Sequence, residues 1–148
     1  MDDLVQWLRA QLDEDERMAR AAGGEAWQWE HGYGDMCNDR TCPYGELATD
    51  EAVIMQVHGF DVRQDDRQVA DHIAAHDPAR VLSEIDAKRR LVDLHTKDEY
   101  YDGCVICDNG NNSCGCMSGW HWTYPCDTLK ILALPYADRP GYREEWRP

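Results

Sequence analysis

The strongest constraint on this chain is the segment 104–126, CVICDNGNNSCGCMSGWHWTYPC, which holds five of the seven cysteines. It opens with a Cys-x2-Cys pair, Cys104 and Cys107, continues to Gly110, and closes on Cys126. Two residues between the cysteines let both thiolates face one ion, and the glycine permits the tight turn that follows. Zn²⁺ favours four thiolate or imidazole ligands in a tetrahedral arrangement. The segment therefore predicts a zinc site.

The spacing alone leaves the fourth ligand of this site open. Cys126 stands at the predicted start of a helix, where backbone N–H groups favour a thiolate, and is the natural third ligand. His95 is one candidate for the fourth, because it lies at the C-terminal end of a long predicted helix. Cys114, Cys116 and His121 are the alternatives.

The net charge of −14 limits the partners that the chain can bind. Residues 1–66 carry −11 of it (16 acidic against 5 basic side chains). The negative electrostatic potential of this charge opposes binding to DNA or RNA phosphates. The charge could instead serve to bind a basic protein, to mimic nucleic acid, or only to keep the protein in solution. No apolar run approaches the roughly 20 residues of a membrane helix, and no signal peptide opens the chain. We therefore expect a cytoplasmic protein, in which closely spaced cysteines indicate metal rather than disulfides.

Hydrophobic periodicity and turn residues predict an α+β domain with three to four helices and a small antiparallel sheet, stabilised by zinc. At 148 residues the length favours a single domain, 1–148. The expected segments are an N-terminal helix (1–22), strands around a Cys37/Cys42 loop (26–58), helices (67–97), a zinc knuckle and strand (104–126), and a C-terminal helix and tail (127–148). Within these, the strands are expected at 26–31, 52–58 and 120–122, and residues 31–45 are expected as a loop.

The predicted helices also carry expectations about which side chains face inward. In the first helix, the residues expected to face inward are Leu4, Leu8, Gln11 or Leu12, and Asp15 or Met18. Residues 13–16 are expected to form a solvated acidic face. In the helix at 67–76, the residues expected to face inward are Val69, Ile73 and His76.

The sequence also predicts where two helices begin. The helix at 78–97 is expected to begin at Asp77-Pro78, and Asp127 or Thr128 is expected to cap the last helix. The cluster Lys88-Arg89-Arg90 is expected to be solvated or paired with the first helix, and the tail to be free or docked through Tyr142 and Trp146.

Three blocks carry a resemblance to a known family: residues 68–95, the Cys-x2-Cys pair, and YPCDTLKILALPYADRPGYREEWRP at 124–148. Together with the opening helix they resemble a family of short actinobacterial and actinophage proteins that is known only as a domain of unknown function. The resemblance covers about two-thirds of the chain. It implies one ligand set of His95, Cys104, Cys107 and Cys126, and a bacterial or phage-infected cell as the setting. It implies no activity.

Four cysteines remain after that assignment, as two close pairs that each adjoin a Trp-x-Trp segment. If those segments are neighbouring strands, Cys37, Cys42, Cys114 and Cys116 could form a second zinc site. A disulfide or free thiols are the alternatives, and His31 and His121 are interpreted as polar neighbours.

The ligand set argues against an enzyme, because three thiolates and one imidazole fill the zinc coordination sphere. The chain has no His-Glu-x-x-His and no Gly-x-Ser-x-Gly. The leading interpretation is a small acidic zinc-binding protein–protein interaction module, plausibly a phage accessory protein acting on a host protein that is itself basic or binds nucleic acid. The alternatives are an acidic nucleic-acid mimic and a zinc enzyme whose catalytic residues are not adjacent in sequence.

Overall fold

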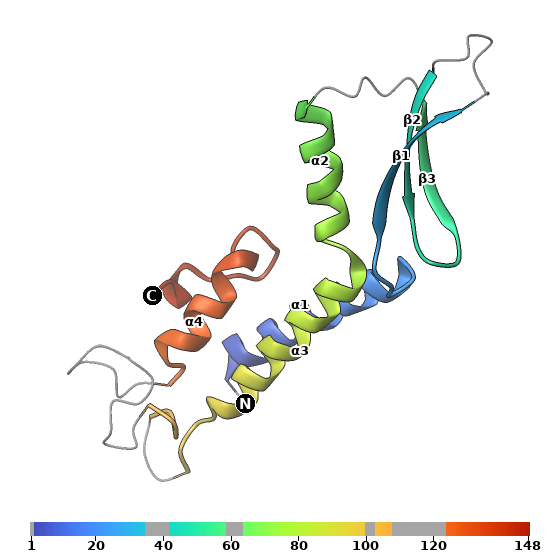
Figure 1. The fold of residues 1–148 in the computed structure, drawn as a ribbon. Helices are drawn as coiled ribbons and strands as arrows, with labels where there is room; N and C mark the ends of the chain where they lie inside the picture. The colour runs from blue at the N-terminus through green and yellow to red at the C-terminus, as the bar shows by residue number, and fades with distance from the viewer. Residues whose placement is uncertain (1, 35–41, 59–63, 100–102, 108–123) are drawn as a thin grey trace. The chain divides into compact units, whose positions relative to one another are not determined.

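The computed structural model describes residues 2–34, 42–58, 64–99, 103–107 and 124–148 (Figure 1). Its elements, in chain order, are α1 (Asp3–Ala21), β1 (Gln28–Gly34), β2 (Cys42–Ala48), β3 (Val53–His58), α2 (Gln64–Ala75), α3 (Pro78–Leu94), α4 (Asp127–Ala133) and the short 3-10 helices η1 (Leu134–Tyr136) and η2 (Glu144–Trp146). The predicted α+β class with a small antiparallel sheet is confirmed. No helix within the described ranges has both the length and the apolar composition of a membrane span.

The chain forms two compact units. The first, here the helical unit, comprises Met1–Glu16 and Glu84–Pro148, and the second, the sheet unit, comprises Arg17–Ser83. The boundaries fall inside α1 and α3, so each of these helices contributes residues to both units.

Helix α1 forms as its sequence predicts. The Asp2 carboxylate accepts a hydrogen bond from the Leu4 backbone N–H at 3.0 Å, which satisfies a donor that the first turn leaves unpaired. Gly23 and Gly24 follow the helix with φ of +104° and +73°, a conformation that glycine adopts without steric cost. Leu4, Leu8 and Leu12 are buried as expected. Of the two alternatives at the third position, Leu12 is fully buried and Gln11 is only half-buried.

The sheet is antiparallel with the order β1-β2-β3. The strands predicted at 26–31 and 52–58 correspond to β1 and β3. The expected loop at 31–45 was wrong at 31–34 and 42–45, which belong to β1 and β2, and residues 35–41 lie outside the described residues. Trp29 pairs with the buried Leu47 across β1 and β2. The Trp29 indole also lies against Gly45 and leaves no room for a Cβ there. Glycine in the central strand is therefore a packing requirement of the sheet. The strand expected at 120–122 lies outside the described residues.

Helix α2 is rotated relative to the prediction. Ala70 is its buried residue at 2 % exposure, whereas Val69 and Ile73 are exposed by 60 % and 38 %, so the expected inward face was wrong. One residue corresponds to about 100° around a helix, which is the difference between the faces of Val69 and Ala70. Of the two alternatives expected inside at the end of the α1 stripe, Met18 is 47 % exposed, whereas the Asp15 side chain is 17 % exposed. Small side chains therefore face inward in the sheet unit where large ones were expected.

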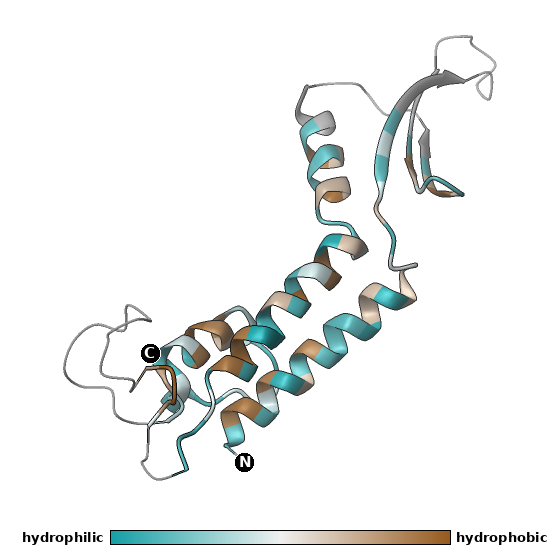
Figure 2. Ribbon diagram, turned by 60° about the horizontal axis from the view of Figure 1, so that its bottom comes forward, coloured by the Kyte–Doolittle hydropathy of each residue, from teal (hydrophilic) through white to brown (hydrophobic). Residues whose placement is uncertain are grey.

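Helix α3 begins as predicted, because the Asp77 carboxylate accepts from the Arg80 N–H at 2.7 Å. It ends at Leu94 and not at residue 97. Ile85 and Val92 are its buried hydrophobic residues. Figure 2 shows hydrophobic stretches of α1, α3 and α4 close together within the helical unit, where the core of that unit lies.

The C-terminal tail docks onto α1, which confirms one of the two expected possibilities. The ring centroid of Trp7 lies 5.4 Å from that of Trp146 and 5.6 Å from that of Tyr142. The Trp7 Nε1–H also donates to the Pro140 carbonyl at 3.0 Å. Gly141 has φ of +88°, and a Cβ there would lie 3.0 Å from Trp7 Nε1. The tail turns closely against the indole at this glycine.

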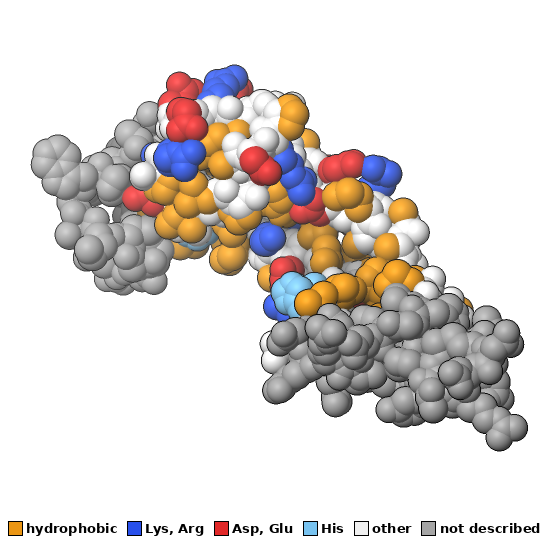
Figure 3. Space-filling model, turned by 90° about the horizontal axis from the view of Figure 1, so that it is seen from above, with side chains coloured by type: hydrophobic (Ala, Val, Ile, Leu, Met, Phe, Trp, Pro, Cys, Tyr) orange, Lys and Arg blue, Asp and Glu red, His pale blue; other side chains and the backbone are white. Residues whose placement is uncertain are grey.

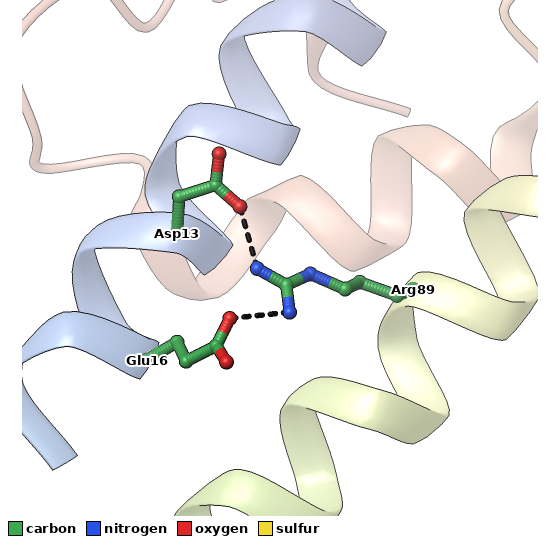
Figure 4. Close-up of polar contacts among 3 residues, drawn as sticks. All are labelled: Asp13, Glu16 and Arg89. Atoms are coloured by element: carbon green, nitrogen blue, oxygen red, sulfur yellow. Dashed lines mark hydrogen bonds and ion pairs between the residues drawn. The ribbon is translucent and has the colours of Figure 1, made fainter. Parts of the chain in front are cut away.

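The acidic run of α1 is bound to arginines within the helical unit. The Arg89 guanidinium donates to the Asp13 and Glu16 carboxylates at 2.5 Å each, which confirms the expected pairing of this basic residue with the first helix (Figure 4). Arg139 donates to the Asp15 carboxylate at 2.6 Å. The expected solvated face at 13–16 was wrong for Asp15 and Glu16, whose side chains are 17 % and 23 % exposed, whereas Asp13 is 70 % exposed although it binds Arg89.

Candidate metal centre

His95 is the first of four side chains that meet at one end of the helical unit. It follows the last residue of α3, and its backbone N–H still donates to the Leu91 carbonyl at 3.1 Å. This bond continues the helical pattern for one residue beyond α3 and fixes the direction of the imidazole. The side chain is only 5 % exposed. The end of α3 thus supplies one buried nitrogen ligand.

Cys104 and Cys107 lie on a short hairpin that starts directly after His95. Residues 96–98 pair with residues 103–105: the Asp98 N–H donates to the Gly103 carbonyl at 2.9 Å, and the Val105 N–H donates to the Thr96 carbonyl at 2.9 Å. This pairing replaces the last turn predicted for α3, and it returns the chain to His95. Cys104 is buried, and a turn then brings the half-buried Cys107 to the same place.

Cys126 completes the group from the start of α4. It is the N-cap residue of this helix, with extended backbone angles and 2 % exposure. The expected cap by Asp127 or Thr128 was wrong, because α4 already begins at Asp127. A thiol therefore occupies the position where the helix N-terminus presents its free N–H groups.

The distances between these side chains match those of a tetrahedral metal site. The Nδ1 atom of His95 lies 3.4 Å from Sγ of Cys104, 3.7 Å from Sγ of Cys107 and 3.4 Å from Sγ of Cys126. For Zn–S bonds of about 2.3 Å and Zn–N bonds of about 2.0–2.1 Å, a tetrahedron places each sulfur about 3.6 Å from the nitrogen. All four ligand atoms lie within 4.8 Å of one another. The group could hold a metal ion without rearrangement of the backbone.

Burial shifts the pKa values of three of these four side chains. It lowers the pKa of His95, so the imidazole is neutral at pH 7 and has a lone pair for a metal. It also raises the pKa of the Cys107 thiol to about 12, with a further contribution from Cys126 nearby. The pKa of Cys126 is raised by burial too, although the Leu129 N–H in the first turn of α4 acts in the opposite direction. A metal ion must therefore displace thiol protons when it binds.

The structure brings together the four residues that the family resemblance implies. Cys114, Cys116 and His121, the other candidates for the fourth ligand, lie outside the described residues. The second predicted set is untested, because Cys37 also lies outside and the side chain of Cys42, at the start of β2, is not described.

Sequence reasoning missed the surroundings of this group. A groove in the helical unit is lined by side chains that flank the ligands, including Thr96, Tyr124, Pro125 and Lys130. Burial raises the pKa of Tyr124 to about 12, and Asp2, Cys104 and Cys126 add to the shift. Their positions in the sequence could have indicated these residues. Thr96, Tyr124 and Pro125 lie within two residues of a candidate ligand, and Lys130 lies one helical turn after Cys126.

A small α+β protein with a buried group of one histidine and three cysteines is the class that the fold and the site define. A family model described as "Family of unknown function (DUF6221)" matches residues 1–148, and the chain belongs to this family. The expectation of an uncharacterised family is thereby confirmed. No curated protein and no solved structure matches the chain.

Proposed function

We propose that His95, Cys104, Cys107 and Cys126 bind Zn²⁺ and that the ion is structural. The observation that carries the proposal is the set of three nitrogen–sulfur distances of 3.4, 3.7 and 3.4 Å around His95 Nδ1. Thiolate and imidazole donors in tetrahedral array select zinc over the hard cations Mg²⁺ and Ca²⁺, which prefer oxygen ligands. Bound there, the ion would join the end of α3, the hairpin and the start of α4.

The complete ligand set supports a structural role over a catalytic one. A catalytic zinc keeps a position open for water or substrate, whereas four protein ligands fill the tetrahedral sphere. The experiment is native mass spectrometry of the purified protein, together with zinc-edge X-ray absorption of a Cys114→Ser, Cys116→Ser, His72→Ala variant loaded with one zinc ion per chain, so that only the His95 group is measured. We expect a bound zinc ion with one nitrogen and three sulfur neighbours. A zinc-free protein, or a water oxygen among the neighbours, would contradict the proposal.

We further propose that the zinc-stabilised fold acts as a protein–protein interaction module with a basic partner. The net charge of −14 supports a basic partner, and the resemblance to actinobacterial and actinophage proteins supports a host protein in an actinobacterial cell, with this chain as a phage accessory protein. Affinity capture from actinobacterial lysate, with a zinc-depleted Cys107→Ser protein as control, tests the proposal. Partners retained equally by both proteins would argue against it.

The arrangement of charge favours this module over a nucleic-acid mimic. A mimic needs free carboxylates spaced like phosphates, whereas Asp13, Asp15 and Glu16 bind arginines of the same unit. On the face shown in Figure 3, the acidic side chains of the described residues are interspersed with basic and hydrophobic ones. A partner contact on such a surface combines apolar and ionic contributions.

The cysteines outside this group remain part of the proposal. We propose that Cys37, Cys42, Cys114 and Cys116 bind a second zinc ion, on the strength of their two close-spaced pairs. Native mass spectrometry distinguishes the alternatives, because two ions per chain would support the second site and one ion would exclude it.

A further inference from the structure

Helix α2 carries two histidines one turn apart on the surface of the sheet unit. His72 and His76 are both exposed, and their ring centroids lie 4.1 Å apart with 42° between the ring planes. Residues at i and i+4 lie on the same face of a helix, and two histidines with this spacing are a recurrent arrangement for binding one metal ion.

A hydrogen bond selects the tautomer of one of the two rings. Nδ1 of His76 lies 2.8 Å from the backbone carbonyl oxygen of His72. A carbonyl oxygen only accepts, so in the neutral His76 ring Nδ1 carries the hydrogen and Nε2 carries the lone pair. Metal-binding histidines in proteins typically donate their second ring N–H to a carbonyl or carboxylate in this way, which fixes the ring orientation and makes the ligand nitrogen more basic.

The separation of the rings is also close to that of a shared ion. Two imidazoles that bind one ion at about 2.0–2.1 Å have centroids about 4.5–5 Å apart, for angles at the metal between square and tetrahedral values. The observed separation of the ring centroids is 4.1 Å, within about 1 Å of this range. A role of His76 in capping the end of α2 explains its hydrogen bond, but it does not explain why the His72 ring lies beside it.

We propose that His72 and His76 form a second kind of metal site, which binds one divalent transition-metal ion such as Ni²⁺, Cu²⁺ or Zn²⁺. Two imidazoles supply only part of the coordination sphere, and water fills the remaining positions. The ion therefore exchanges readily, unlike one enclosed by the four ligands of the His95 group, three of which are buried. This site lies in the sheet unit, is separate from the His95 group, and does not depend on whether that group binds zinc.

The test is a calorimetric titration of Ni²⁺ into the purified protein, the single variants His72→Ala and His76→Ala, and a matched control. In the control, His72→Ala is combined with Gln68→His, which keeps the number of exposed histidines on the same face of α2. The two histidines are then eight residues apart, about 12 Å along the helix, too far to share an ion.

Beyond any Ni²⁺ held by cysteines, we expect one Ni²⁺ in the wild type that binds at least about tenfold more weakly in both single variants and in the control, because the second ligand acts intramolecularly. Binding by cysteines elsewhere persists in all four proteins and cancels in the comparison. Circular dichroism verifies that each variant remains folded. In a second readout, paramagnetic Ni²⁺ should broaden the amide NMR signals of residues 72–76 in the wild type alone. Equal affinity in the wild type and the control would overturn the proposal.

Discussion

Within the described part of the chain, the two units differ in how many apolar side chains they bury. Among the described residues, twelve buried hydrophobic or cysteine side chains belong to the helical unit and only three to the sheet unit, namely Ala19, Leu47 and Ala70. Three consecutive residues of β3, Val53, Ile54 and Met55, are instead between 42 % and 51 % exposed. Because hydrophobic burial is the main favourable term in folding, stability should concentrate in the helical unit.

The difference explains where a structural metal is most effective. A metal ion held by His95, Cys104, Cys107 and Cys126 would join the end of α3, the hairpin and the start of α4, all in the unit that already has a core. The sheet unit relies on strand pairing and on single contacts such as Trp29 against Gly45. The predictions below test whether stability is concentrated in the helical unit, because each one compares a change there with a matched change elsewhere.

Loss of the metal should have the largest effect. Chelation, or Cys107→Ser, is expected to lower the melting temperature by more than about 10 °C, because structural zinc contributes folding free energy directly. Hydrogen exchange should rise first in α4 and at the end of α3. Val53→Ser, in β3 and 51 % exposed, is the control and should leave the protection of the helical unit intact. An unchanged melt after complete chelation would exclude a structural metal.

Acidification should weaken zinc binding steeply. The pKa values of Cys107 and Cys126 are raised, so at least two protons leave when the ion binds, whereas His95 is already neutral. The affinity should therefore fall at least about a hundredfold per pH unit as the pH decreases below 8. Competition with a chromophoric chelator between pH 6 and 8 measures this slope.

The metal-free protein should show the opposite dependence on pH. Its Cys107 pKa is raised from 9.0 to about 12, so this thiol's contribution to stability is present below pH 9 and is lost as the pH rises towards 12. The zinc-loaded protein, whose thiols are already ionised, should lack this alkaline loss. Identical alkaline melting curves with and without zinc would contradict the assignment of Cys107 as a ligand.

Equivalent core truncations should separate the two units. Leu129→Ala in α4 is expected to cost about 2–5 kcal/mol of unfolding free energy, as is typical for a fully buried leucine. Leu47→Ala, from the sparse core of the sheet unit, should cost less, because the cost depends on how closely the site is packed. Ile131→Ala, 56 % exposed in the same helix, is the surface control. Equal losses at Leu129 and Leu47 in denaturant titrations would refute the proposed division.

The ion pairs of α1 should have the smallest effect. Arg89→Ala is expected to cost about 1–2 kcal/mol, because its side chain is only 32 % exposed and contacts two carboxylates. Arg90→Ala, whose partner Asp86 lies on the same helix and is exposed, should change stability by less than about 0.5 kcal/mol. A double-mutant cycle with Glu16→Gln isolates the pair, and a coupling energy of zero would show that the contact contributes nothing.

Much of the fold could be predicted because its signals are local. Asp2 and Asp77 cap α1 and α3, and Gly23 ends the first helix, through bonds and torsions within a few residues. The spacing of Cys104 and Cys107 indicated a shared ion in the same way. The fourth ligand was not local: spacing left it open, and only the family resemblance pointed to His95, which the structure places 3.4 Å from Sγ of two cysteines.

The errors of prediction lie where contacts across the chain outweigh local preference. Strand β2 carries Pro43 and Gly45, residues that usually end strands, yet it is the central strand because Trp29 occupies the space over Gly45. Helix α2 places Ala70 inside and Val69 outside, although hydrophobicity alone favours the reverse. In both cases the shape of the packed neighbour decided between residues that the sequence pattern ranks differently.

The sequence by itself determined the helices, two strands, the Cys-x2-Cys turn and the excess of negative charge, since each follows from neighbours along the chain or from composition. Only the tertiary structure decided that His95 Nδ1 faces three sulfurs, that the acids of α1 bind Arg89 and Arg139, and that His72 lies beside His76. The physical reason is the distance along the chain over which each interaction acts. Capping and torsional preferences act within one turn, whereas a ligand set requires atoms of residues up to 31 positions apart to converge within 4.8 Å.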